Sequence, residues 1–339
     1  MRKAVHFVKQ MVATGLYSSG ALSLIARTRL RHRMPVLMYH RVIDDKHVCD
    51  VHSSSGIIVS KDVFRMQMAT IRQWLNPIGI DEFIEYLRSG HGIPQRSCLV
   101  TFDDGWVDNY DIALPIIREF SIPAVVFLPT NYISADKMFW QEELLVSMSD
   151  AIASADEERL AMMSEILNSG SQSYELTMDG VRTYISDLKT GRDSDINEML
   201  ERIRKLTPAG PGLQHYNQYL TWSQVREMQE QGLSFGSHAV SHRALDKLSE
   251  QDCRNELRTS RRIIEEKIAL PVLSLAYPNG NYNEDVVREA RDAGYEVAFT
   301  TEPGFFDRNA DPLRVPRINI HDNNSSTKSR FLCATVGLF

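Results

Sequence analysis

The stretch Cys98-Leu-Val-Thr-Phe-Asp-Asp-Gly105 joins a short apolar run to two adjacent carboxylates. Residues 98–102 have the length and composition of a buried β-strand, and Asp103 and Asp104 follow where this strand is predicted to stop. Two neighbouring carboxylates repel each other, so burying both without a partner would be costly. A metal ion would resolve the conflict by binding one carboxylate and leaving the other free as a base; a solvated Asp-Asp-Gly turn is the alternative.

Apolar runs of the same kind lie on both sides of this stretch and alternate with helical patterns. Strands are predicted over 35–39, 124–128, 233–237, 273–277 and 295–300, and helices over 60–75, 81–87, 112–120, 221–232, 249–268 and 283–294. This alternation predicts an α/β fold with a mostly parallel sheet, open or closed as a barrel. Four strands end at polar groups, namely at His40, at Asp103, at His238 and at the turn 277–280. In parallel barrels the carboxyl ends of the strands carry the active site.

His238 and His242 are four residues apart in Gly236-Ser-His-Ala-Val-Ser-His242. On a helical turn this spacing places both imidazoles on one face, as a divalent metal site requires. Paired histidines are also common as surface or capping residues, but this pair begins where a strand stops. One aspartate and two histidines leave coordination positions open for water and substrate, which is typical of a catalytic metal site.

The composition sets limits on the class of protein. The chain has 339 residues, 43% hydrophobic and 24% charged, which excludes a disordered chain. Its net charge of −6 offers no basic excess for generic nucleic-acid binding. The four cysteines form no C-x-x-C pair and are interpreted as ordinary buried thiols; they are Cys49, Cys98, Cys253 and Cys333.

Two segments depart from the strand–helix rhythm. Residues 1–33 are basic and mildly apolar, and they are too polar for a good membrane-spanning helix. This segment either lies on an anionic membrane surface or packs on the domain. Residues 136–216 contain no clear strand and are rich in helix-forming residues, so we expect a helical insertion into a domain over 34–330.

The motifs at the strand ends resemble a known family. Thr101-Phe-Asp-Asp-Gly105 and Ser237-His-Ala-Val-Ser-His242 are similar to two signature motifs of the polysaccharide deacetylases, the NodB-homology group or carbohydrate esterase family 4. Val36-Leu-Met-Tyr-His40 and Ala276-Tyr-Pro-Asn-Gly280 resemble its exopolysaccharide branch. The resemblance covers roughly 34–135 and 217–325 and implies a deformed (β/α) barrel. It also implies that Asp103 is the general base and that Asp104, His238 and His242 hold a divalent metal ion, for which Zn²⁺ is our first expectation.

The chain departs from the family pattern at the third motif, where Ala276 and Asn279 replace an arginine and a tyrosine. That arginine pairs with the base in the family, so another residue must orient Asp103, and Arg317 is the candidate. His321 fits the family's catalytic-histidine motif only loosely. It is either the acid that protonates the leaving amine or a histidine of a surface loop.

The remaining residues at the strand ends are expected to contact substrate: His40, Trp106, Tyr277 and Asn279. His40 is otherwise a buried, hydrogen-bonded histidine. The resemblance implies metal-dependent removal of N-acetyl groups from amino sugars of a bacterial polysaccharide or its precursor. Three alternatives remain: a deformylase or deacetylase of a lipid-carrier-linked amino sugar, an inactive glycan-binding protein, and a non-haem iron oxygenase. We expect a cytoplasmic protein, peripheral at the inner membrane through residues 1–33, with export left open.

Overall fold

The computed structural model describes residues 2–44, 53–90, 92–154, 156–169, 172–188, 193–206 and 218–339. The chain divides into two compact units. The first comprises Met1–Val48, Ser55–Ala135 and Tyr219–Phe339, and the second Cys49–Ser54 and Asp136–Gln218. The interval 136–216 therefore falls in the second unit, while residues 1–33 belong to the first.

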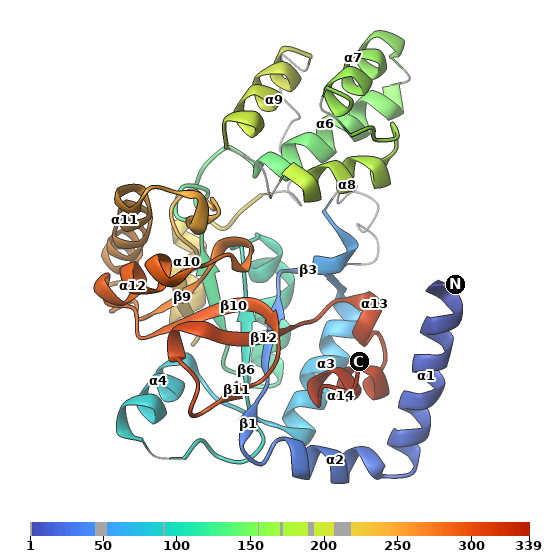
Figure 1. The fold of residues 1–339 in the computed structure, drawn as a ribbon. Helices are drawn as coiled ribbons and strands as arrows, with labels where there is room; N and C mark the ends of the chain where they lie inside the picture. The colour runs from blue at the N-terminus through green and yellow to red at the C-terminus, as the bar shows by residue number, and fades with distance from the viewer. Residues whose placement is uncertain are drawn as a thin grey trace. The chain divides into compact units, whose positions relative to one another are not determined.

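Parallel strands form the centre of the first unit (Figure 1). They are β2 (Val36–Tyr39), β6 (Ser97–Phe102), β7 (Val125–Leu128), β8 (Ser234–Ser237), β9 (Ser274–Ala276), β10 (Val297–Pro303) and β12 (Val315–Asn319). They pair in the order β2-β12-β10-β9-β8-β7-β6, and β6 pairs again with β2, so the sheet closes. The predicted deformed (β/α) barrel is confirmed. Strand β12 was not among the predicted strands, because Pro316 and Arg317 interrupt its apolar pattern.

Five short strands flank the barrel strands. β5 (Asn76–Pro77) pairs beside β6, and β3 (Arg41–Ile43) pairs in parallel with β4 (Ile58–Ser60). β1 (Arg33–Met34) runs antiparallel to β11 (Phe306–Asp307). These pairs tie the segments around the barrel to its strands.

Helices follow the strands, as the sequence pattern predicts, and α3, α10, α11 and α12 are seen around the barrel in Figure 1. Thr221 caps α10 in a capping box with Gln224, and Ser249 and Asn283 cap the next two helices. The helices are α3 (Lys61–Trp74), α4 (Ile80–Ser89), α5 (Leu114–Glu119), α10 (Trp222–Glu230), α11 (Glu250–Ile268), α12 (Glu284–Asp292), α13 (Asp322–Ser325) and α14 (Lys328–Thr335). Short helical turns are η2 (Ser55–Ile57), η3 (Asn109–Ala113), η5 (Leu245–Lys247), η6 (Pro278–Gly280) and η7 (Pro312–Arg314).

Aromatic side chains fill the interior of the barrel and leave little space beside β8. Phe127 and Phe299 lie with their ring centroids 5.4 Å apart, and both are completely buried. A Cβ atom at Gly236 would lie 2.5 Å from the Phe127 ring. The glycine before the Ser237-His238 motif therefore lets the strand approach this ring.

The N-terminal segment folds into α1 (Arg2–Ser18) and α2 (Ala21–Arg29). Both helices pack on α14 through a small apolar cluster that includes Ala13, Leu22 and Leu332, and Figure 1 shows α1, in dark blue, beside α14, in red. Among the helices that the structure describes, none is both long and apolar enough to cross a membrane. Buried free thiols are confirmed for Cys98, Cys253 and Cys333, while Cys49 lies outside the described residues.

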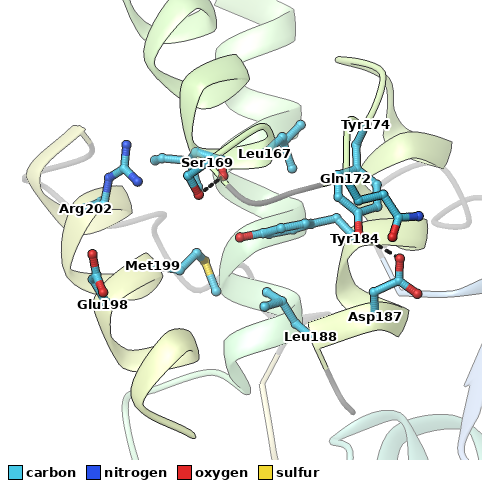
Figure 2. Close-up of a pocket in the computed structure, with 11 residues that line it drawn as sticks. Leu167, Ser169, Gln172, Tyr174, Tyr184, Asp187, Leu188, Glu198, Met199 and Arg202 are labelled. Carbon is cyan, nitrogen blue, oxygen red and sulfur yellow. Dashed lines mark hydrogen bonds between the residues drawn. The ribbon is translucent and has the colours of Figure 1, made fainter. Parts of the chain in front are cut away.

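The second unit contains α6 (Trp140–Ser154), α7 (Glu157–Leu167), α8 (Met178–Leu188) and α9 (Asp193–Leu206), packed around their own apolar core. Figure 2 shows a pocket in this unit, of about 420 Å³, with Leu167, Tyr184 and Met199 among its lining residues. No residue of the predicted site lines this pocket. The candidate chemistry belongs to the barrel.

Candidate active site

The carboxyl ends of the barrel strands bring the predicted polar residues together. His40 follows β2, Asp103 and Asp104 follow β6, His238 follows β8, and His321 lies two residues beyond β12. Backbone pairing continues up to this edge, since the Asp103 N–H donates to Tyr39 O and the His238 N–H donates to Leu128 O, both at 3.0 Å. The side chains therefore begin where the rigid ladder ends, the arrangement expected for a barrel active site.

Asp104, His238 and His242 form a cluster that can hold a metal ion. Asp104 Oδ1 lies 3.5 Å from His238 Nε2 and 3.3 Å from His242 Nε2, and one ligand atom from each residue lies within 4.8 Å of the other two. His238 Nδ1 lies 2.7 Å from the Ala276 carbonyl oxygen. That contact places the ring proton on Nδ1 and leaves the Nε2 lone pair free for a ligand.

The electrostatics of this cluster favour a bound cation. Burial alone would raise the pKa of Asp104, but hydrogen bonds with His238 and His242 hold that pKa well below its usual range. Burial alone would lower the pKa of His238, but Asp104 and Asp103 together raise it. Without a metal ion, His238 therefore binds a proton more readily than a free imidazole does. A bound cation would replace that proton as the positive charge beside the two aspartates.

The two histidines converge through a loop, which corrects the expected helical turn. Ala239 and His242 both have positive φ angles, 60° and 58°, which a helix does not allow. The carboxylate of Glu256, on α11, accepts hydrogen bonds from the Val240 and Ser241 N–H groups at 2.7 and 2.9 Å. Glu256 thus holds the loop between His238 and His242, the two candidate ligands. No sequence pattern indicated this role, because Glu256 lies fourteen residues beyond His242.

The Trp106 side chain holds the carboxylate of Asp104 in place. Its indole Nε1 donates to Asp104 Oδ2 at 3.2 Å, its ring stacks on Tyr219 with centroids 4.6 Å apart, and the Arg41 guanidinium lies 4.1 Å from the ring centroid. Arg41 in turn pairs with buried Asp108 at 3.0 Å. Trp106 is completely buried, and its expected contact with substrate stays a prediction.

We expect Trp106→Phe to weaken metal binding by about 10–100-fold, since the indole N–H that orients a ligand oxygen is lost. Metal affinity is measured by titration with a competing chelator. Tyr295→Phe is a matched control, because it removes a hydrogen bond of a buried aromatic residue, from the Tyr295 hydroxyl to Leu257 O, at no predicted ligand. Equal affinities in the wild type and Trp106→Phe would contradict this role.

Asp103 and Arg317 form a buried, bidentate ion pair. Arg317 Nη1 and Nη2 donate to the two carboxylate oxygens of Asp103 at 2.7 and 2.6 Å, and Arg317 Nε donates to Thr300 O at 2.8 Å. Burial would raise the pKa of Asp103, but the Arg317 charge and hydrogen bonds lower it overall. The predicted pairing is present, and it keeps Asp103 ionised although both side chains are almost completely buried.

His40 and His321 complete the polar edge beside Asp103. His40 Nε2 lies 4.0 Å from Asp103 Oδ2, and burial lowers the pKa of His40 against the opposing effect of the two aspartates. Burial lowers the pKa of His321 too, and the charges of Arg330 and His40 lower it further. The Nδ1 atoms of both histidines are buried and have no hydrogen-bond partner among the described residues.

Tyr277 and Asn279 differ in what they can offer a substrate. Tyr277 is completely buried and its hydroxyl donates to Leu313 O at 3.0 Å, so this side chain supports the fold, and its expected contact with substrate stays a prediction. Asn279 is partly exposed and has a left-handed backbone conformation with φ 55° in η6. Its place after β9 is compatible with substrate contact, which remains a prediction.

A closed parallel barrel with carboxylates and imidazoles gathered at the carboxyl ends of its strands is the architecture of a barrel enzyme. The chain belongs to the polysaccharide deacetylase family, whose model matches residues 91–298. It is 23% identical over 308 residues to a poly-beta-1,6-N-acetyl-D-glucosamine N-deacetylase of Staphylococcus epidermidis, covering 86% of this chain and 80% of the relative.

Solved structures agree with this fold. The deacetylase PplD of Streptococcus pyogenes, in complex with acetate, superposes with a TM-score of 0.57 at 19% identity, over 87% of this chain and 95% of that chain. IcaB from Ammonifex degensii superposes with the same TM-score at 17% identity, over 91% and 98% of the two chains. Family membership therefore rests on the sequence match, and the barrel fold is shown by the superposed structures.

Proposed function

We propose that this protein is a metal-dependent N-deacetylase that acts on N-acetyl amino sugars of a bacterial polysaccharide. The observation that carries the proposal is the pairing of Asp103 with Arg317 beside the Asp104–His238–His242 cluster. An ionised, oriented carboxylate next to a candidate metal site is the arrangement that hydrolysis by an activated water requires. A protein that only binds glycans has no use for this spare carboxylate.

The donor set fits a divalent ion, since two imidazoles and one carboxylate suit Zn²⁺ and leave positions open. Asp104, His238 and His242 would hold the ion, and Trp106 and Glu256 support this assignment by fixing the ligands. A bound ion would supply polarisation of the amide carbonyl and a lowered pKa for water. Zinc is our first choice among the divalent ions.

The remaining groups are assigned to proton transfer and substrate binding. Asp103 accepts a proton from the attacking water, and Arg317 keeps Asp103 in position and ionised. His321 is assigned the proton transfer to the departing amine. Because burial lowers the pKa of His321, the imidazole must first take up the proton that it donates. His40 and Asn279 contact the sugar or the developing oxyanion.

The relatives favour a polymer of N-acetylglucosamine as substrate, since the Staphylococcus epidermidis protein is named for poly-β-1,6-N-acetyl-D-glucosamine. The second candidate is a lipid-carrier-linked amino sugar bearing an acetyl or formyl group, favoured by the basic N-terminal segment. The iron oxygenase alternative gives no role to Asp103. Cytoplasmic localisation stays a prediction.

The test is release of acetate or formate from a panel of N-acetylated glycans and lipid-linked amino sugars, without oxygen or co-substrate. We expect acetate from an N-acetylglucosamine polymer, loss of activity with a chelator and recovery on adding Zn²⁺ back. Release only from lipid-linked sugars would replace the polymer with the second candidate. Binding of the glycans without any turnover would contradict the enzyme assignment.

A further inference from the structure

Helix α1 packs on the domain through polar side chains in its first half and through the apolar cluster around Ala13 and Tyr17 in its second half. The Thr327 hydroxyl donates to Gln10 Oε1 at 3.1 Å, His6 contacts the Arg330 guanidinium, and Lys9 lies 5.4 Å from the centroid of the Phe339 ring. Together with buried Ala13, these residues recur every three or four positions and define the face that packs on the domain.

The opposite face of α1 is apolar and exposed. Phe7 is 66% exposed, Met11 60% and Val8 57%, and Val12 lies on the same side. Of the nine large hydrophobic side chains that are exposed in the described part of the chain, six belong to α1 and α2. A soluble surface does not gather apolar side chains in this way unless another surface covers them.

The charge of the same segment indicates what covers this face. Residues 1–33 contain seven Lys and Arg residues and no Asp or Glu. The whole chain has a net charge of −6, so the remaining 306 residues carry a net charge of −13. Positive charge is thus concentrated in the same N-terminal segment as the exposed apolar face, with four of the seven basic residues at 27–33. This combination favours an anionic lipid surface over an apolar protein partner.

A hollow beside α1 offers a place for a phosphate headgroup. It has a volume of about 950 Å³ and is lined by Val5, Phe7 and Lys9 on the helix and by Arg330 on α14. Arg330 is 4% exposed, and its Nε has no hydrogen-bond partner among the described residues. Lys9 and Arg330 supply the positive charge at this hollow, which suits a phosphate group, and the Arg330 guanidinium also contacts His6 and Asn323 O.

We propose that α1 docks this protein on an anionic phospholipid surface, with Phe7, Val8, Met11 and Val12 inserted among the lipids and the exposed Arg27 and Arg31 at the headgroups. This inference goes beyond the proposed reaction and does not depend on it. It places the barrel at a membrane surface whether the sugar substrate is a polymer or is linked to a lipid.

The test is co-sedimentation of the full chain with phosphatidylcholine vesicles that contain or lack phosphatidylglycerol. We expect at least about tenfold stronger binding to the anionic vesicles, weakened by salt because the basic residues attract the headgroups. Phe7→Ser/Met11→Ser should lose at least about tenfold in binding, since both side chains leave the lipid. Leu270→Ser is the matched control, because Leu270 is an equally exposed apolar residue outside the N-terminal segment.

A charge variant tests the second part of the proposal. Arg27→Gln/Arg31→Gln should weaken binding to anionic vesicles and leave the slight binding to pure phosphatidylcholine unchanged; Arg29 is kept because it donates to Val336 O and Gly337 O. Equal binding to both vesicle types, or unchanged binding by Phe7→Ser/Met11→Ser, would overturn the proposal. So would a dimer, detected by light scattering, that these serine substitutions dissociate while vesicle binding stays absent.

Discussion

We expect Asp103→Asn to retain the metal ion and to lose activity by about 10²–10⁴-fold, the usual contribution of a general base. Asparagine has nearly the same shape and can still accept a hydrogen bond from Arg317, but it cannot take a proton from water. The measurement is kcat for deacetylation of an N-acetylated glycan, together with metal content by elemental analysis.

The control for this prediction must separate loss of the base from loss of a buried ion pair. Removing one partner of such a pair can cost about 3–5 kcal/mol of stability, so thermal unfolding is measured and activity is assayed well below the midpoint. Glu289→Gln is a matched variant, because Glu289 is buried and accepts two hydrogen bonds from Arg254, each of 2.9 Å, between α11 and α12. It should lose stability and keep kcat. Near-normal activity of Asp103→Asn would show that the base is another group.

The second large effect is expected for His238→Ala, which should abolish both metal binding and turnover. His238 is buried and contributes a ligand atom whose orientation the Ala276 carbonyl fixes. Without it, Asp104 and His242 alone form a much weaker site, because two ligands rarely retain a divalent ion. Metal content per chain and acetate release measure the two losses separately.

His32→Ala is the control for this substitution, since His32 is exposed and remote in sequence from the motifs. It should leave metal content and activity unchanged. Restoring activity of His238→Ala with excess Zn²⁺ would support a role in affinity. Full metal content in that variant would contradict the ligand assignment.

The parallel sheet and much of the site could be predicted from local patterns, while the closure of the sheet into a barrel was implied by the family resemblance. Short apolar runs that alternate with helices indicate a parallel sheet, and polar residues directly after several of these runs indicate one reactive edge. Asp103, Asp104, His238 and His242 were found in this way, because each lies within a few residues of a strand end. The family resemblance then supplied their roles, which remain to be measured.

Contacts between residues far apart in the sequence could not be read from local patterns in the same way. The side chains of Asp103 and Arg317 are 214 positions apart in sequence, and β12 carries Arg317 on a strand whose pattern contains a proline. Burial depends on tertiary structure too, since Trp106 and Tyr277 follow strand ends and yet their side chains are buried. A sequence shows that a residue lies near the end of a strand. It does not show whether the side chain of that residue points into the core or into the active site.

The orientation of α1 is a third feature that depends on tertiary structure. The sequence offers both a polar and an apolar face, and the usual expectation is that the apolar one packs inward. Here Gln10 and His6 have polar partners on the 327–330 segment, and the small cluster around Ala13 suffices to hold the helix. Only the packed structure shows which face is left outside.

Arg317 reaches Asp103, the proposed base, from β12, while the family motif places the corresponding arginine at the position of Ala276, the last residue of β9. The strands of a closed barrel surround a common interior. A long side chain such as that of arginine can therefore place its charge beside the same carboxylate from more than one strand. During evolution such a charge can therefore move between strands without moving the reacting carboxylate. Surveys that score catalytic competence by the residue at one aligned column would count this chain among the inactive members.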